Sequence, residues 1–277
     1  MSVGILSAIH GPADVHALDA AELPALCGEI RTTLVRYGHV HGGHIGSNLG
    51  MVEATVALHR VFSSPRDRIV FDVSHQSYVH KMLTGRAAAY FDPAHAGEAT
   101  GFTNPEESEH DQFALGHTGT SVSLACGLAK ARDAAGGSGN VIAVIGDGSL
   151  SSGVAFEGLN NAGASKQTNL LVILNDNNMA IDQATGALKN YLVKISTSRR
   201  YNAIKRRLWR ILSHTPAVLR FCQKAGNAVK QGLLKNSNLF ESLNFRYFGP
   251  IDGHNLPELV RALKIKPSTI ESNDPTT

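Results

Sequence analysis

The chain has 277 residues, with 26 Lys and Arg, 23 Asp and Glu, three cysteines and 43% hydrophobic residues. This length can bury a substantial core, and the ordinary hydrophobic and charged fractions exclude wholesale disorder. No run of about 18 apolar residues occurs, so we expect no segment that spans a membrane. The few, distant cysteines make a reducing cytoplasm the expected location.

Apolar periodicity predicts alternating helices and strands in the first half of the chain. Helical spacing of apolar residues predicts helices over 22–37 and 51–62, with a break in the glycine-rich stretch 38–46. A β-branched run predicts a short strand over 68–73, and a stretch of small residues predicts a helix over 121–134.

The alternation continues around two apolar strands. Buried strands are predicted over 141–145 and 170–174, with a helix over 154–164 between them. Continuous apolar strands that alternate with helices indicate a parallel sheet covered on both faces. We therefore expect an α/β fold, a doubly wound and mostly parallel sheet with helices on both faces, in a single domain over 1–277.

The chain beyond residue 182 departs from this pattern. Residues 183–240 contain twelve basic residues and no acidic residue, so we expect a basic helical insert over 183–238 within the domain. Three interpretations stay open: surface helices with solvated charges, a mobile lid whose field attracts anionic substrates, and a surface for nucleic acid or anionic membranes. The last of these is the least favoured.

After the insert, the pattern predicts a helix over 239–243, a strand over 245–248 and a helix over 256–263, with Pro257 in the first turn of the last helix. The polar end over 267–277 is expected to be frayed. No strand follows the last predicted helix, so a β–α–β unit is expected to stop short.

Polar residues follow both apolar strands where each strand ends. Asp147, flanked by two glycines, closes the first strand, and Asn177 follows the second. The carboxyl ends of neighbouring parallel strands open on one ligand-binding edge. Carboxylate and amide oxygens suit Mg²⁺, and glycines with the amides of the next helix can bind a diphosphate. These residues therefore predict a site for Mg²⁺ and a diphosphate.

Other interpretations of this edge are weaker. A plain Gly-Asp-Gly turn does not account for the second polar strand end. A dinucleotide-binding fingerprint needs glycine where Ser151 stands, which argues against an NAD-dependent oxidoreductase. The stretch from Asp176 begins like a calcium loop but lacks the Gly and Glu at the required offsets.

Eleven of the thirteen histidines lie at or before His117. The spacing of His39, His41 and His44 matches no standard zinc site, and a glycine-rich loop fixes three ligands poorly. We instead expect histidines of this half to act as hydrogen-bond donors, or as acid and base, in a site for a phosphorylated sugar. Five histidines are assigned to the surface or the core: His10, His16, His59, His95 and His110.

Several motifs in a fixed order resemble one family. They are GHIGSNLG over 43–50, DVSHQSYVHKMLTG over 72–85, GHTGTS over 116–121 and GPIDGH over 249–254. With the Asp147 and Asn177 site, they are similar to the amino-terminal half of the 1-deoxy-D-xylulose 5-phosphate synthases, thiamine-diphosphate enzymes of the transketolase superfamily. The resemblance runs from about Leu6 to Lys264 and implies an intact amino end.

The resemblance implies a role for each matching residue. Mg²⁺ would be held by the side chains of Asp147 and Asn177 and by the carbonyl of Met179. The cofactor would be contacted by His75, Gly116, His117, Thr118, Gly148, Ser149 and Asn177, with Gly148 and Ser149 at the diphosphate. His44 would be the histidine that transfers a proton and contacts the sugar phosphate.

Four positions depart from the family's usual residues without removing a ligand. Ser74 stands in place of a usual Gly and is expected to narrow the cofactor pocket slightly. Thr118 and Gly119 stand where the family often has two serines, and Asn178 stands where Glu is common.

The chains of this family continue with a further strand, a Gly-x-Gly-Tyr cofactor contact, a pyrimidine-binding domain whose Glu activates the cofactor ring, and a third domain. We therefore expect the diphosphate-binding subunit of a split transferase, paired with a separately encoded carboxy-terminal half in a homo- or hetero-oligomer. The pair would transfer a two-carbon unit from a keto acid or ketose to an aldose phosphate, as in isoprenoid precursor biosynthesis. The chain alone would show little or no turnover. The alternative is a truncated, non-catalytic synthase half that only binds cofactor or a partner.

Overall fold

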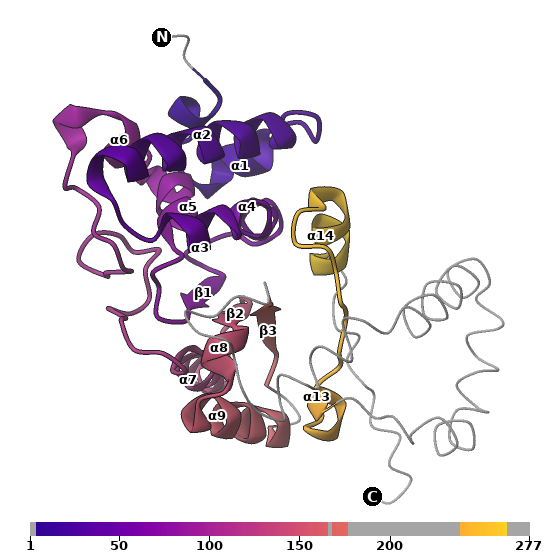
Figure 1. Cartoon of the computed structure of the whole chain (residues 1–277). Helices are drawn as coiled ribbons and strands as arrows, with labels where there is room; N and C mark the ends of the chain where they lie inside the picture. Colours follow the sequence, from indigo (N-terminus) through magenta and orange to yellow (C-terminus); the bar gives the residue numbers. More distant parts are fainter. Residues whose placement is uncertain (1–3, 166–167, 177–238, 265–277) are drawn as a thin grey trace, which may run out of the picture.

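The computed structural model describes residues 4–165, 168–176 and 239–264 (Figure 1). It contains a parallel three-stranded sheet of β1 (Arg68–Phe71), β2 (Val141–Gly146) and β3 (Leu170–Asn175), in that order. The register pairs Phe71 with Val144 and Gly146 with Asn175. The prediction of an α/β fold with a parallel sheet is therefore confirmed, and these three strands begin at the predicted residues.

Helices alternate with these strands as predicted, and the helices over 121–134 and 256–263 have the predicted bounds. The helices and helical turns are η1 (Leu6–Ala8), α1 (Pro12–Ala17), α2 (Leu23–His41), α3 (Ile45–Leu49), α4 (Val52–Val61), α5 (Tyr78–Lys81), η2 (Met82–Arg86), α6 (Ala88–Phe91), η3 (Pro93–His95), α7 (Ser121–Ala134), α8 (Asp147–Leu150), α9 (Gly153–Ala164), α13 (Leu239–Ser242) and α14 (Leu256–Leu263).

The side chains of β2 alternate between two apolar cores, because successive residues of a strand point to opposite faces. Val141, Ala143 and Ile145 pack in one cluster with residues of α7 and α9. Ile142 and Val144 pack in the other with residues of α4. Figure 1 shows α4 and α14 on one side of the sheet and α7 and α9 on the other. Helices therefore cover both faces, as the doubly wound prediction requires.

The third strand is less buried than predicted. β2 is buried from Val141 to Ile145, whereas every residue of β3 is half-buried. Within the described part of the chain, β3 lies at the edge of the sheet and has no strand on its outer side. The prediction of a buried strand over 170–174 is therefore correct in position and wrong in burial.

The helix predicted over 22–37 continues to His41 and ends at Gly42, whose φ is 72°. Gly38 thus lies inside α2, although the glycine-rich stretch predicted a break there. A Cβ atom on Gly38 would overlap the side chain of Ile45 in α3. Glycine is therefore needed at this position for the close approach of α3, and the chain turns only at Gly42.

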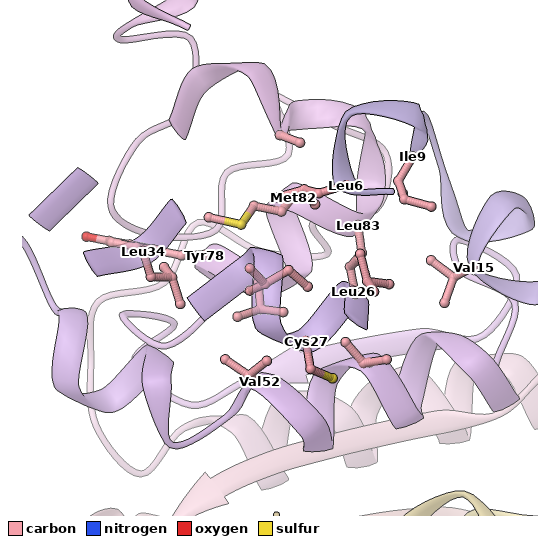
Figure 2. Packing of buried hydrophobic residues seen from close by; sticks show 14 of the residues in the cluster. Leu6, Ile9, Val15, Leu26, Cys27, Leu34, Val52, Tyr78, Met82 and Leu83 are labelled. Carbon is pink, nitrogen blue, oxygen red and sulfur yellow. The ribbon is translucent and has the colours of Figure 1, made fainter. Parts of the chain in front are cut away.

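A third apolar core lies among the helices of the amino-terminal half. Leu26 and Leu34 of α2 are fully buried and belong to one cluster with Val52, Tyr78 and Met82 (Figure 2). This core joins α2 and α4 to α5. It therefore fixes the two turns that follow α2 and precede α5, and these turns carry His44 and His75.

The last described segment returns to the body of the domain. α14 packs against α4, and the side chain of Asn255 caps it by accepting a hydrogen bond from the N–H three residues later, at 3.2 Å. The strand predicted over 245–248 is wrong, because this segment is irregular. The N–H of Phe245 bonds locally to the carbonyl of Phe240 at 2.9 Å instead of joining a strand.

The basic insert predicted over 183–238 and the frayed end predicted over 267–277 lie outside the described residues. None of the helices in the described ranges is both long enough and apolar enough to cross a membrane.

Candidate functional site

The predicted site lies at the carboxyl edge of the sheet. Asp147 comes directly after β2 as the first residue of α8, and it is half-buried. Asp176 comes directly after β3, and the pairing of Gly146 with Asn175 brings the two strand ends side by side. The other predicted metal ligands, Asn177 and Met179, lie outside the described residues, as does Asn178. Asp147 is therefore the one predicted ligand whose place in the fold is described.

Asp72 at the end of β1 was not predicted as a site residue, yet it organises this edge. Its carboxylate is buried and accepts hydrogen bonds from the N–H groups of Gly119 at 2.8 Å and Ser121 at 2.9 Å. These bonds hold the loop before α7 against the end of β1. The signal available in the sequence was that Asp72, like Asp147, directly follows a buried strand.

The loop held by Asp72 contains three predicted cofactor residues, Gly116, His117 and Thr118, and all three are exposed. The hydroxyl of Thr118 donates a hydrogen bond to the hydroxyl of Ser149 at 2.8 Å. Ser149 lies in α8, two residues after Asp147. The structure thus brings this loop to the start of α8.

The turn after β1 has an unusual backbone. Val73 and Ser74 have φ values of 58° and 71°, in the region that favours glycine. Ser74, which we expected to narrow the cofactor pocket, is fully buried. Its hydroxyl donates to the carbonyl of Leu115 at 3.3 Å and accepts from the N–H of Thr103 at 2.9 Å. These two hydrogen bonds connect the turn after β1 to the segments at Thr103 and Leu115, and they hold Ser74 in a backbone conformation that favours glycine.

His44 and His75 are brought together, with their ring centroids 5.2 Å apart. The buried side chain of Asn48 links their turns, because its amide nitrogen donates to the carbonyls of His44 and His75, each at 2.8 Å. Its oxygen accepts from the N–H of Tyr78 at 2.9 Å. All hydrogen-bonding atoms of the Asn48 amide are thus engaged in fixing the two histidine turns.

The two histidines differ in environment. His44 is exposed, and the ring of Phe102 lies 5.7 Å from its ring. His75 is half-buried, and burial, followed by the nearby His44, lowers its pKa from the ordinary histidine value. The Nδ1 atom of His75 is buried without a hydrogen-bond partner among the described residues. His75 is therefore a neutral imidazole at neutral pH with one ring atom available to a ligand.

The zinc interpretation would need His39, His41 and His44 as ligands, and all three are exposed in the structure. His39 and His41 lie in the last turn of α2, where the ring of His41 packs against Tyr37 at 4.8 Å between centroids. Across the described ranges, no three His, Cys, Asp or Glu side chains gather into a group that could hold a metal ion.

Comparison with known proteins assigns the family. The family model described as 1-deoxy-D-xylulose-5-phosphate synthase, amino-terminal, matches residues 6–272. The chain is 47% identical to the 1-deoxy-D-xylulose-5-phosphate synthase of Thioalkalivibrio sulfidiphilus over 263 residues, which is 95% of this chain and 41% of that protein. It is also 47% identical to the synthases of Chlorobaculum tepidum, over 94% of this chain and 41% of that protein, and Thiobacillus denitrificans, over 95% and 42%.

The chain thus spans about two fifths of the length of the curated relatives it matches. The match covers the motifs around His44, His75, His117 and Asp147. The chain therefore belongs to the 1-deoxy-D-xylulose-5-phosphate synthase family, of which it represents the amino-terminal half.

Proposed function

We propose that this chain binds Mg²⁺ and the diphosphate end of thiamine diphosphate at the carboxyl edge of its sheet. Enzymes of this family depend on thiamine diphosphate and Mg²⁺. The observation that carries the proposal is the hydrogen bond between Thr118 and Ser149, which joins the loop held by Asp72 to the helix that begins at Asp147.

The described residues fit such a group. A Cβ atom on Gly116 or on Gly146 would meet nothing within 4 Å, so the backbone at both positions is open to close approach. The carboxylate of Asp147 is the kind of hard oxygen ligand that Mg²⁺ prefers. The buried Nδ1 atom of His75, which has no partner among the described residues, is suited to a polar atom of a ligand.

Each residue has a distinct part in this proposal. Asp147 would hold Mg²⁺ together with Asn177 and Met179, and Gly148, Ser149, Gly116, His117, Thr118, His75 and Asn177 would contact the cofactor. The bound cofactor supplies an electron sink for breaking and forming carbon–carbon bonds next to a carbonyl. His44 is exposed beside His75, and an imidazole is the side chain that most often serves as a general acid or base. It would exchange a proton with the sugar substrate.

The activity of the whole enzyme requires more than this chain. We propose transfer of a two-carbon unit from a keto acid or ketose to an aldose phosphate, with the pyrimidine-binding domain supplied by a separate carboxy-terminal chain. The retained His44 and Asp147 favour this subunit role, and we expect little turnover without the partner. The alternative is a non-catalytic half that only binds cofactor or a partner.

Calorimetric titration of thiamine diphosphate into the chain, with and without Mg²⁺, tests the proposal. We expect Mg²⁺-dependent binding that is abolished in Asp147→Ala. The control is Asp133→Ala, which removes an exposed carboxylate near the carboxyl end of α7, whereas the loop at Gly116 precedes the amino end of that helix. This variant should bind normally. Absence of binding by the wild-type chain, alone and with an added carboxy-terminal half, would refute the proposed site. Synthase turnover by the chain alone would refute the partner requirement.

A further inference from the structure

A buried ionic cluster outside the proposed cofactor site joins α5 and η2 to the loop 96–119. His80, Lys81 and Arg86 come from α5 and η2, and Glu107 and Asp111 come from the loop. Lys81 is completely buried and Asp111 is 3% exposed. Charged side chains are rarely buried to this degree unless they are paired, so the cluster must be assembled in the folded chain.

Asp111 is the centre of the cluster. Arg86 donates to both of its oxygens through two nitrogens, each at 2.8 Å. His80 Nε2 lies 3.2 Å away, and the N–H of Asn104 donates at 2.9 Å. Burial acts to raise the pKa of Asp111, but the hydrogen bonds from Arg86 and His80 and the charge of Arg86 outweigh it and hold this pKa well below its usual range. Asp111 is therefore an ionised, acceptor-only group.

The ionised Asp111 also sets the protons of two buried histidines. Because the carboxylate only accepts, the proton of His80 lies on Nε2, and its Nδ1 accepts from His59 Nε2 at 2.9 Å. The remaining atom, His59 Nδ1, is then unprotonated, which agrees with its lack of a hydrogen-bond partner in the described part of the chain. Burial lowers the pKa of both histidines, so both are neutral.

A second anchor lies nearer the start of the loop. Lys81 Nζ donates to Glu107 at 2.6 Å and to the carbonyl of Thr100 at 2.8 Å. Glu107 in turn accepts from the N–H of Thr100 at 3.0 Å. The loop is therefore tied to α5 and η2 at Thr100, Glu107 and Asp111.

The segments beside these anchors are the ones that meet the proposed cofactor site. Phe102, two residues after Thr100, packs against the ring of His44. Thr118, seven residues after Asp111, donates a hydrogen bond to Ser149. Besides the ionic cluster, the polar links of this irregular loop run to Ser74, to Asp72 and, from His110 Nδ1 at 2.9 Å, to the hydroxyl of Ser64.

We propose that Asp111 is a positioning residue, which holds the loop 100–118 so that Phe102 packs against His44 and Thr118 reaches Ser149. Its effect on cofactor affinity rests on the proposed function, whereas its effect on the loop does not. Asp111 touches neither His44 nor Ser149, so it would act only through the placement of the loop.

Asp111→Asn in the full chain tests this inference, because the amide keeps the shape of the carboxylate but presents a donor to Arg86 or His80. The matched control is Asp67→Asn. Asp67 is equally buried, at 1% exposed, and it accepts from the N–H groups of Ser63 and Asn140, each at 2.7 Å, just before β1 at the opposite end of the sheet. Glu107→Gln is a milder variant that weakens the second anchor if Asp111→Asn does not fold.

Three measurements are made on each variant. Amide hydrogen exchange over 100–118 should be about tenfold faster or more in Asp111→Asn. The NMR resonance of the His44 ring should move towards its position in Phe102→Ala, because the Phe102 ring no longer shields it. The dissociation constant for thiamine diphosphate with Mg²⁺ should rise about tenfold, as is typical when a residue that orients binding groups is lost. Asp67→Asn should leave all three unchanged.

Each outcome is decisive. Unchanged exchange and an unchanged His44 resonance in a folded Asp111→Asn or Glu107→Gln variant would overturn the inference, as would equal changes in Asp67→Asn. Changed loop exchange with an unchanged dissociation constant would overturn the link to the cofactor. If the wild-type chain binds no cofactor, the proposed function fails, and the exchange and NMR measurements still decide whether Asp111 holds the loop.

Discussion

Replacing Asp72 by Asn should destabilise the domain by more than an ordinary loss of a helix cap. The carboxylate is 1% exposed and accepts from the N–H groups of Gly119 and Ser121 at the start of α7. An amide keeps one acceptor and turns a donor towards the other N–H. Leaving a buried N–H unsatisfied costs about 1–3 kcal/mol, and removing a negative charge from a helix amino terminus adds about 0.3–1 kcal/mol. The expected loss is therefore about 1.3–4 kcal/mol.

Asp14→Asn is the matched control. Asp14 also accepts from two backbone N–H groups before a helix, those of His10 at 2.7 Å and Gly11 at 3.0 Å, but water reaches this site. Its replacement should cost about 0.5–1 kcal/mol. Urea unfolding followed by far-ultraviolet circular dichroism measures both free energies of unfolding. A loss in Asp72→Asn no greater than in Asp14→Asn would refute the role of Asp72 as a buried tether.

Four further outcomes are expected. Burial is the main cause that lowers the pKa values of four histidines, His59, His75, His80 and His110, so the unfolded chain binds more protons below about pH 6.5. Towards pH 5, before the carboxylates titrate, the free energy of unfolding should fall by up to about 1.4 kcal/mol per pH unit for each histidine. A flat urea stability profile over this window would contradict the burial of these side chains. Ile142→Ala should cost about 2–5 kcal/mol in the same assay, because this fully buried side chain of β2 leaves a cavity. Asn48→Asp removes both donors that link the carbonyls of His44 and His75, so calorimetry should find weaker cofactor binding. The control Asn160→Asp, at an exposed position, should leave cofactor binding unchanged. Gly119→Ala should also weaken binding, because φ at this position is 80° and the added Cβ would overlap Ser152; normal affinity would show that the loop can shift freely.

The elements of the sheet were predictable because their signal is local. The runs over 69–71, 141–145 and 170–174 are apolar and contain β-branched residues, and this local pattern indicates strands. The same reasoning predicted a strand over 245–248 that does not form. The N–H of Phe245 bonds to the carbonyl of Phe240 in the preceding turn. The apolar pattern of a short segment does not show whether its backbone will bond within a turn or to a neighbouring strand.

The position of Asp147 at the head of α8 followed from its place after β2, and the resemblance supplied the roles proposed for His44, His75 and the loop at Gly116. Asp72 was missed because the N–H of Gly119, which it binds, is 47 positions away along the chain. The anchors at Asn48 and Asp111 were missed for the same reason, since their partners come from other turns and loops.

What the sequence alone determined is therefore the α/β class, the positions of the three strands and the polar residue that ends β2, because each depends on neighbours along the chain. Only the tertiary structure decided which buried polar groups meet. Asp72 with Gly119, Asn48 with His75 and Asp111 with Arg86 are bonds between segments with no common periodicity. Burial makes each of these groups require a partner, but it is the packing of the helices on the sheet that selects which partner it finds.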